Sequence, residues 1–302
     1  MDEVKVTVIC LTFNHEAWIR DALEGFVSQR TPWPIEVLVH DDASTDGTAA
    51  VIREYESRYP SVIKGFYAPA NLSSQGVRIA RDVLFPHIRG EYVALCEGDD
   101  YWTDPDKLRL QVEALEANPD ADICAHAAKR TRPGGRVWYD APRRTDALIP
   151  AGDVILGGGG FVVTSSLLLR RERYMDVPPF REVLYSDYSL QIWGSLRGGM
   201  VFIGRSMSVY RQGLPGSWTA RHKGAAHSEY RVLIRNMLRS LDQYTSGRWS
   251  KEIDLRIRLY DSDDLASSGR ILSLLAPRQL PVTRMQIRRN ILKLVNHLSY
   301  RL

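Results

Sequence analysis

The sequence predicts an α/β protein, with a mostly parallel sheet flanked by helices and a helical extension at the C-terminal end. Three observations indicate this fold class. Apolar runs of strand length alternate with segments of helical periodicity through the first half of the 302 residues, a rhythm typical of crossover units. The apolar runs are continuous, which indicates strands buried on both faces. From about Ala225 the pattern is helical to the end.

The first strand is predicted at "KVTVICL" and the first helix at "EAWIRDALEGFVSQ", in which Trp18, Ala22 and Leu23 recur at helical spacing. The same alternation continues along the chain. The predicted strands of this half cover residues 5–11, 35–42, 62–68, 91–97 and 121–127, and the predicted helices cover residues 16–29, 46–59, 76–88 and 106–120.

The rhythm changes near Thr131. Residues 130–146 are rich in Gly, Pro and Arg and predict a hairpin or an exposed loop. Strands are expected again at 164–171 and 199–211, on either side of a helix at 186–198. The run of glycines that begins at Gly157 lacks the Lys-Ser/Thr that completes a phosphate loop of nucleotide hydrolases.

The composition predicts a cytoplasmic protein. The start, "MDEVKVTVICLTFN", carries acids where a secretory signal has its basic region. No stretch approaches the roughly 18 apolar residues that a membrane-spanning helix needs. Cys10, Cys96 and Cys124 each lie in an apolar run without metal-ligand spacing, which predicts buried thiols in a reducing compartment.

The net charge of +4 is unevenly distributed along the chain. Residues 266–302 contain no Asp or Glu but carry seven Lys and Arg residues, beside an apolar helical face. We rank docking on the rest of the chain, or a homodimer contact through the C-terminal helices, ahead of weak association with the surface of an anionic membrane. A solvated helix face explains the charge equally well. No nucleic-acid partner is predicted.

Polar side chains follow the predicted parallel strands where each strand ends. Ligands of open parallel sheets bind beyond these carboxyl ends, so we expect the side chains to form one rim. A carboxylate at the end of the second strand can accept hydrogen bonds from a nucleobase or a ribose, whereas the Ser-Thr-Asp that follows is better explained by helix capping. The rim comprises Thr12 to His15, which includes Asn14, then Asp41 and Asp42, Asn71 to Gln75, and Glu97 to Asp100.

Three carboxylates, Glu97, Asp99 and Asp100, occupy four positions directly after a buried strand. They repel one another and resist dehydration, so this cluster requires a cation. Mg²⁺ or Mn²⁺ is the simplest one, because hard divalent ions bind through one or two carboxylates together with substrate phosphates. The alternative is a capping cluster for the helix that begins near Asp106, but Asp104 and Asp106 suffice for that.

Five segments resemble, in order and spacing, the bacterial family 2 glycosyltransferases of GT-A fold, a Rossmann-like α/β fold. The likeness covers roughly residues 4–213, and it depends on the order of the motifs rather than on any one of them. The segments are "VTVICLTFNHEAWIRDALEGFVSQ", "IEVLVHDDASTDGT", "NLSSQGVRIARD", "GEYVALCEGDDYWTDPDKL" and "SDYSLQIWGSLRGG…SVYR".

The resemblance implies inverting transfer of a sugar from a nucleotide diphosphate sugar, UDP-linked by default, with dTDP or GDP as alternatives. The implied acceptor is a glycan, a lipid-linked intermediate or a small molecule. Processive relatives such as cellulose synthases carry membrane helices and a Gln-x-x-Arg-Trp motif, which are not found here, so a non-processive enzyme is expected. The implied division is a catalytic domain at 1–222, with a nucleotide-sugar-binding part at 1–128 and an acceptor-binding part at 129–222, and a helical extension at 223–302.

The resemblance also implies roles for individual residues. Asp187 corresponds to the general base, and Asp99 to the acid that binds the metal on the diphosphate, with Asp100 beside it. Two positions depart from the family pattern: Glu97 replaces the usual first Asp, and "SVYR" lacks the following His, for which His222 is the nearest substitute. The implied nucleotide-sugar contacts are Thr12, Asn14, Asp41, Asp42, Asn71, Arg78, Glu97 and Asp99.

Other readings stay open at this point. A sugar nucleotidyltransferase would place a Gly-rich loop after the first strand, where this chain has "TFNHEAW", and a hydride-transferring Rossmann enzyme would need Gly-x-Gly-x-x-Gly. A catalytically silent sugar-nucleotide-binding or scaffold protein would share the fold. Ser186 or Asp187 could simply cap the helix that begins there, and Glu182 is the nearest rival acid for the role of base.

Overall fold

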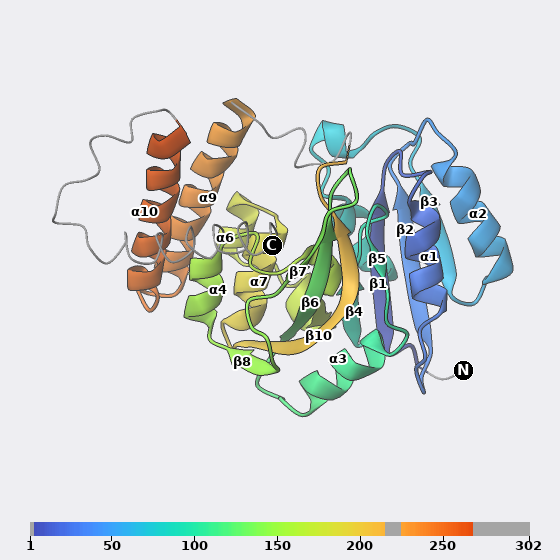
Figure 1. Cartoon of the computed structure of the whole chain (residues 1–302), viewed down its shortest axis with the longest axis horizontal. Helices are drawn as coiled ribbons and strands as arrows, with labels where there is room; N and C mark the ends of the chain where they lie inside the picture. Colours follow the sequence, from blue (N-terminus) through green and yellow to red (C-terminus); the bar gives the residue numbers. More distant parts are fainter. Residues whose placement is uncertain (1–2, 215–224, 268–302) are drawn as a thin grey trace, which may run out of the picture.

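The computed structural model describes residues 3–214 and 225–267 (Figure 1). His222 and residues 268–302, which include most of the basic tail, lie outside the described residues. The strands are β1 (Val6–Thr12), β2 (Ile35–Asp41), β3 (Ile63–Tyr67), β4 (Tyr92–Leu95), β5 (Tyr101–Trp102), β6 (Ile123–Thr131), β7 (Val137–Asp140), β8 (Ala147–Ile149), β9 (Leu168–Arg170) and β10 (Met200–Arg211).

The helices lie between these strands and after them. They are α1 (Ile19–Val27), α2 (Thr48–Arg58), α3 (Lys107–Glu116), α4 (Ala151–Gly157), α5 (Arg171–Met175), α6 (Pro179–Val183), α7 (Asp187–Ser195), α9 (Ala225–Tyr244) and α10 (Ser250–Ser267). Short turns of other helix types are η1 (Ser73–Gln75), η2 (Ala80–Leu84), η3 (Phe85–His87) and η4 (Thr164–Ser166). Among the described residues, no helix is long and apolar enough to cross a membrane.

One sheet of ten strands runs through the molecule in the order β3-β2-β1-β4-β9-β6-β10-β5, with β7 beside β6 and β8 beside β10. The strands β3, β2, β1 and β4 pair in parallel, as predicted, and so do β6 and β10. The short strand β9 lies between β4 and β6 and is antiparallel to both. The sheet is therefore parallel in its first half and mixed in its second.

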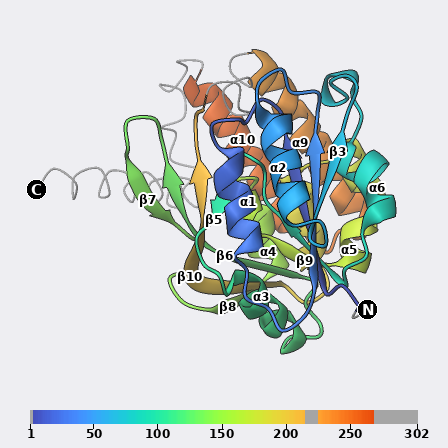
Figure 2. The ribbon, with the colours of Figure 1, turned by 90° about the vertical axis from the view of Figure 1, so that its right-hand side faces the viewer.

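The sheet is buried on both faces, which explains the continuous apolar runs of the sequence. Alternate residues of β1 point to opposite sides: Val6, Val8 and Cys10 pack with α1, α2 and α3, and Ile9 packs in the core formed with α4, α7 and α9. Figure 2 shows α1 and α2 in front of the parallel strands. The three cysteines are buried free thiols, as predicted.

The regular helix predicted at 76–88 is wrong. The chain instead forms a π-helical turn at η2 and a 3₁₀ turn at η3. Pro86 lies inside η3 and has no backbone N–H to continue an α-helix, which is a sufficient reason for the interruption. The hairpin predicted near residues 130–146 is confirmed by the antiparallel pairing of β6 with β7.

A buried carboxylate, Asp122, joins three segments of the second half. Its oxygens accept hydrogen bonds from Arg173 Nε at 2.8 Å and from Arg197 Nε at 3.0 Å. Arg173 follows β9, whereas Arg197 lies between α7 and β10, so one side chain ties the start of β6 to both connections. The Asp122 side chain is only 5% exposed, which makes these charge-assisted bonds stronger than surface ion pairs.

Asp122→Ala should lower the free energy of unfolding by about 3 kcal/mol, because it leaves two guanidinium groups without their shared anion. Chemical denaturation monitored by circular dichroism would measure this. Asp120→Ala removes an exposed acid two residues away and should change stability by less than about 0.5 kcal/mol. Equal stability of the two variants would contradict the role given to Asp122.

Candidate active site

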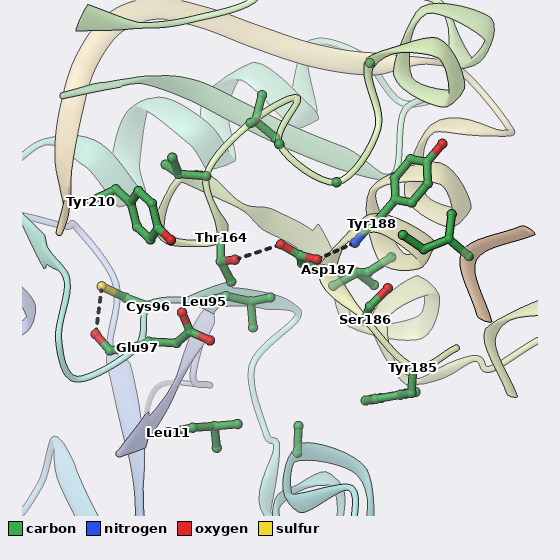
Figure 3. Close-up of a pocket in the computed structure, with 18 of the residues that line it drawn as sticks. Leu11, Leu95, Cys96, Glu97, Thr164, Tyr185, Ser186, Asp187, Tyr188 and Tyr210 are labelled. Carbon is green, nitrogen blue, oxygen red and sulfur yellow. Dashed lines mark hydrogen bonds between the residues drawn. The ribbon is translucent and has the colours of Figure 1, made fainter. Parts of the chain in front are cut away.

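A pocket of about 690 Å³ lies between the carboxyl ends of β1 and β4 and the helices of the second half. Leu11 and Leu95 form its floor on the sheet side, and the start of α7 forms the facing wall (Figure 3). Three of the predicted site residues, Glu97, Asp99 and Asp187, line this one pocket. Residues that are about 90 positions apart in the sequence thus share a single cavity.

Asp187 is the first residue of α7, but it does not cap the helix. Ser186 does: its hydroxyl accepts from the backbone N–H of Ser189, and the Ser189 side chain bonds back to the Ser186 N–H. This capping box satisfies the helix end without Asp187. The capping role therefore belongs to the neighbouring serine, and the carboxylate faces the pocket (Figure 3).

The Asp187 carboxylate is held by two local hydrogen bonds. Oδ1 accepts from the Tyr188 backbone N–H at 2.7 Å, and Oδ2 accepts from the Thr164 hydroxyl at 3.3 Å, both drawn in Figure 3. Burial nevertheless raises the pKa of Asp187, and these bonds only partly offset that effect. A carboxylate with a raised pKa holds a proton more tightly, which suits a general base.

Glu97 projects into the same cavity from the turn after β4 (Figure 3). Its side chain is exposed within the pocket, and the other residues of the lining surround it. Loss of hydration, together with the negative charges of Asp99 and then Asp187, raises the pKa of Glu97 to about 8. The part of the pocket around Glu97 therefore has an excess of negative charge.

Asp99 and Asp100 lie in different environments. Asp99 lines the pocket, and its carboxylate is 4.0 Å from the ring of His15. Asp100 is fully buried behind the pocket wall: Oδ1 accepts from the Arg211 backbone N–H at 2.9 Å, and Oδ2 has no hydrogen-bond partner among the described residues. Burial and the charges of Asp99 and Glu97 raise the pKa of Asp100 well above its ordinary value.

Four polar residues of the rim, Asn14, Asp41, Asp42 and Asn71, hold loops together. Asn14 Oδ1 accepts from the Thr45 N–H at 2.8 Å, Asp41 accepts from the Ser44 hydroxyl, and Asn71 Oδ1 accepts from the Ser74 N–H. Asp42 accepts from the backbone N–H groups of residues 72 and 73, at 2.8 and 3.0 Å. Both aspartates are 3% exposed and neither lines the pocket. Direct contact with a nucleotide stays a prediction for all four.

Thr12 and Arg78 also lie outside the pocket lining. The Thr12 hydroxyl is buried and has no hydrogen-bond partner among the described residues. Arg78 pairs with Glu182, whose backbone carbonyl accepts from Nη2 at 2.9 Å. Glu182, the rival acid for the role of base, is also paired with Arg81 at 2.5 Å and is engaged in these contacts.

The residues of the pocket fit a divalent ion whose remaining ligands are substrate phosphates. Within the described part of the chain, no three His, Cys, Asp or Glu side chains converge as a ready-made cage. Asp99 nevertheless lines the pocket. The next residue, Asp100, has a carboxylate oxygen, Oδ2, without a hydrogen-bond partner among the described residues. The raised pKa of Glu97 shows the charge deficit that a cation would relieve. Mg²⁺ or Mn²⁺ commonly binds through so few carboxylates.

The sequence reasoning missed several cationic residues of the pocket: Arg130, Arg181, Arg211, Arg231 and Arg256. Arg211 ends the "SVYR" segment, so its position next to the acid cluster could have been inferred. Its Nη1 donates to the Asp99 carbonyl at 3.0 Å, and its side chain pairs with Asp21. Arg181, Arg231 and Arg256 carry no such signal, because they reach the pocket through helix packing. Arg130 lies near the end of β6.

Comparison with known proteins agrees with this site and fold. Residues 7–176 match the model of glycosyl transferase family 2, which is more than half of the chain. An uncharacterized protein of Mycobacterium tuberculosis is 36% identical over 213 residues, which are 70% of this chain and 60% of that protein. The chain thus spans less than two thirds of the length of that relative.

Two solved structures share the fold. S. aureus TarS 1–349 in complex with UDP aligns with a TM-score of 0.64 at 17% identity, over 91% of this chain and 76% of that one. The mannosyltransferase PcManGT from Pyrobaculum calidifontis, in complex with GDP-Man and Mn²⁺, aligns with a TM-score of 0.56 at 19% identity, over 97% and 81% of the two chains. The architecture is therefore the GT-A fold of glycosyltransferases. The chain belongs to glycosyl transferase family 2.

Glu97→Gln should change the pH dependence of stability. Because the folded-state pKa of about 8 exceeds the ordinary value of 4.5, the native state keeps a proton that the unfolded state has released between these values, and stability falls as the pH rises. Glutamine removes this loss. In EDTA, the melting temperature of Glu97→Gln minus that of the parent should grow from about pH 5 to about pH 8.5.

The matched control is Glu113→Gln, which removes an exposed acid on α3. Its melting-temperature difference should stay constant over the same pH range. A constant difference for Glu97→Gln as well would show that the pKa of Glu97 is ordinary.

Proposed function

We propose that this chain is an inverting, non-processive glycosyltransferase that moves one sugar from a nucleotide diphosphate sugar to an acceptor hydroxyl. UDP is the default nucleotide, with dTDP or GDP as alternatives. The acceptor is a glycan, a lipid-linked intermediate or a small molecule. Family membership supports this proposal, as do proteins of the same fold that were solved with UDP and with GDP-Man.

The observation that carries the proposal is that Asp187 faces the same pocket as Glu97 and Asp99. Displacement at an anomeric carbon needs a base for the acceptor proton and, opposite it, a place for a departing diphosphate. Asp187 takes the proton while the acceptor oxygen forms its bond to the anomeric carbon. The bond between that carbon and the diphosphate oxygen breaks on the other face, so the configuration inverts.

In this proposal Asp99 would hold Mn²⁺ or Mg²⁺ together with the diphosphate of the donor, and Asp100 would supplement it. When bound, the metal supplies positive charge at the leaving group. Arg211 fixes the backbone carbonyl of Asp99 and so orients the turn that presents its carboxylate. We also propose the division of the chain into a donor-binding part at 1–128, an acceptor-binding part at 129–222 and a helical extension from 223.

Asp99→Asn should reduce the rate of sugar transfer by at least about 100-fold, the usual loss when an electrostatic contact to a transition state is removed. It should also abolish the stabilisation by UDP that depends on Mn²⁺, which is about 2.7 kcal/mol at 100 times the dissociation constant. Asp106→Asn, at the residue that precedes α3 and outside the pocket lining, should leave both unchanged. Full activity of Asp99→Asn, or parent activity in EDTA, would refute the metal assignment.

Asp187→Asn should lower the turnover number by about 10² to 10⁴, the usual contribution of a general base, while the affinity for UDP stays the same. Because Ser186 caps α7, the melting temperature should change little. Glu182, the rival acid, provides the control. Glu182→Gln should keep most of the turnover number.

Near-normal turnover of Asp187→Asn with a lowered melting temperature would show a structural role instead. The rival function, a catalytically silent sugar-nucleotide-binding or scaffold protein, is tested by slow hydrolysis of UDP-sugars without an acceptor. The parent should hydrolyse the donor and Asp187→Asn should not.

A further inference from the structure

Two buried arginines of the pocket have no anionic partner in the described part of the chain. Arg181 of α6 is 1% exposed, and Arg256 of α10 is 7% exposed. Neither lies within ion-pair distance of a described carboxylate, and Nε of each has no hydrogen-bond partner among the described residues. Burying a guanidinium ion without an anion is costly, so these side chains suggest a ligand that supplies the anion.

The surroundings hold both guanidinium groups in place. Arg181 Nη1 donates to the Asp176 carbonyl at 3.0 Å, and Arg256 Nη1 donates to the Leu156 carbonyl at 3.3 Å. Arg256 lies 4.0 Å from the centre of the Tyr260 ring, a cation–π contact that fixes its plane. These contacts orient the groups but neutralise neither charge.

The glycine run noted in the sequence makes room for one of them. Gly158 has a φ of +73°, and a Cβ atom there would lie 2.3 Å from Nη2 of Arg256. Gly157, Gly159 and Gly160 line the same pocket. The loop is therefore shaped around the guanidinium group, whose fork of N–H donors matches the geometry of a phosphate.

Arg256 lies away from the donor side of the pocket, whereas Arg181 packs on Tyr185 beside Arg78, an expected donor contact. Arg211 lies at the acid cluster, beyond the carboxyl end of β4, whereas α6 and α10 belong to the helical half of the molecule (Figure 1). Asp187 lies between the two regions, at the start of α7. In an in-line displacement the acceptor approaches the base from the side opposite the leaving diphosphate. The part of the helical half around Arg256 is consequently the acceptor side.

From this geometry we propose that Arg256, with the loop Gly157–Gly160, forms a phosphate-binding subsite for the acceptor. The acceptor is then a molecule that carries a phosphate group close to the hydroxyl that receives the sugar. This inference rests on the proposed function, because only that function makes the bound phosphate compound an acceptor. Phosphate binding itself can be tested independently.

The test uses inorganic phosphate and glycerol 3-phosphate as probes, titrated calorimetrically into the full chain in EDTA so that no metal competes. Arg256→Gln should weaken binding of both probes by at least about tenfold, the effect of losing charge-assisted hydrogen bonds. Arg258→Gln, on the exposed side of the same helix, should bind them like the parent. Equal binding by Arg256→Gln and the parent would overturn the proposal, and so would equal affinity of the parent for acetate.

Two further measurements keep the result interpretable. Arg256→Lys retains the charge without the fork, so it should bind phosphate with intermediate affinity and fold even where glutamine does not. UDP affinity in Mn²⁺ should be the same in all variants. If the parent bound phosphate but not UDP, the proposed function alone would be refuted. If it bound UDP but not phosphate, the subsite alone would be refuted.

The source of the phosphate is distinguished in the same way. Binding of glycerol 3-phosphate in free solution without sedimentation on vesicles that contain phosphatidic acid indicates a soluble acceptor. Sedimentation with vesicles that contain phosphatidic acid, lost in Arg256→Gln and absent with neutral vesicles, indicates a lipid-linked one. Sedimentation that persists fully in Arg256→Gln would assign the lipid contact to another part of the chain and count against the subsite.

Discussion

The concentration of negative charge on the sheet side of the pocket is the constraint on which the site depends. Glu97, Asp99 and Asp187 face one cavity, and Asp100 is buried directly behind it. The charge of Asp99 adds to burial in raising the pKa of both Glu97 and Asp100, so the cluster is stable in ionised form only when a cation is near. The protein provides Arg211 at the turn, but that side chain is already paired with Asp21.

The fold brings the acids together by two different means. Glu97 and Asp99 follow the carboxyl end of the parallel strand β4, where ligands of such sheets bind. Asp187 arrives from the opposite wall, where the capping box of Ser186 fixes the first turn of α7 and Thr164 of η4 holds the carboxylate. The antiparallel strand β9 follows η4 directly, so its pairing with β4 anchors this wall to the sheet.

Sequence reasoning recovered what depends on local periodicity and missed what depends on distant contacts. The buried strands and the acids at their ends follow from patterns of a few residues, and they were predictable. The antiparallel position of β9 was not, because strand pairing is set by the whole sheet. Arg256 reaches the pocket only because α10 packs on α4, across 100 residues of sequence. The nucleotide contact of Asp42 stays a prediction, and the role of its carboxylate in holding the backbone of the η1 turn was not foreseen.

Two acids of the pocket, Glu97 and Asp99, follow β4, whereas two of its arginines, Arg181 and Arg256, lie on the helical half. Such sorting is not required for stability, because pairing Arg181 or Arg256 with a carboxylate would lower the cost of burying them. A folded chain that keeps both signs apart instead retains an electric field across the cavity. Under the proposed function, this field favours a donor diphosphate with its cation near Glu97 and Asp99, and a phosphate-bearing acceptor near Arg256. Asp187, at the start of α7, is then the proposed base at the point where these two ligands would meet.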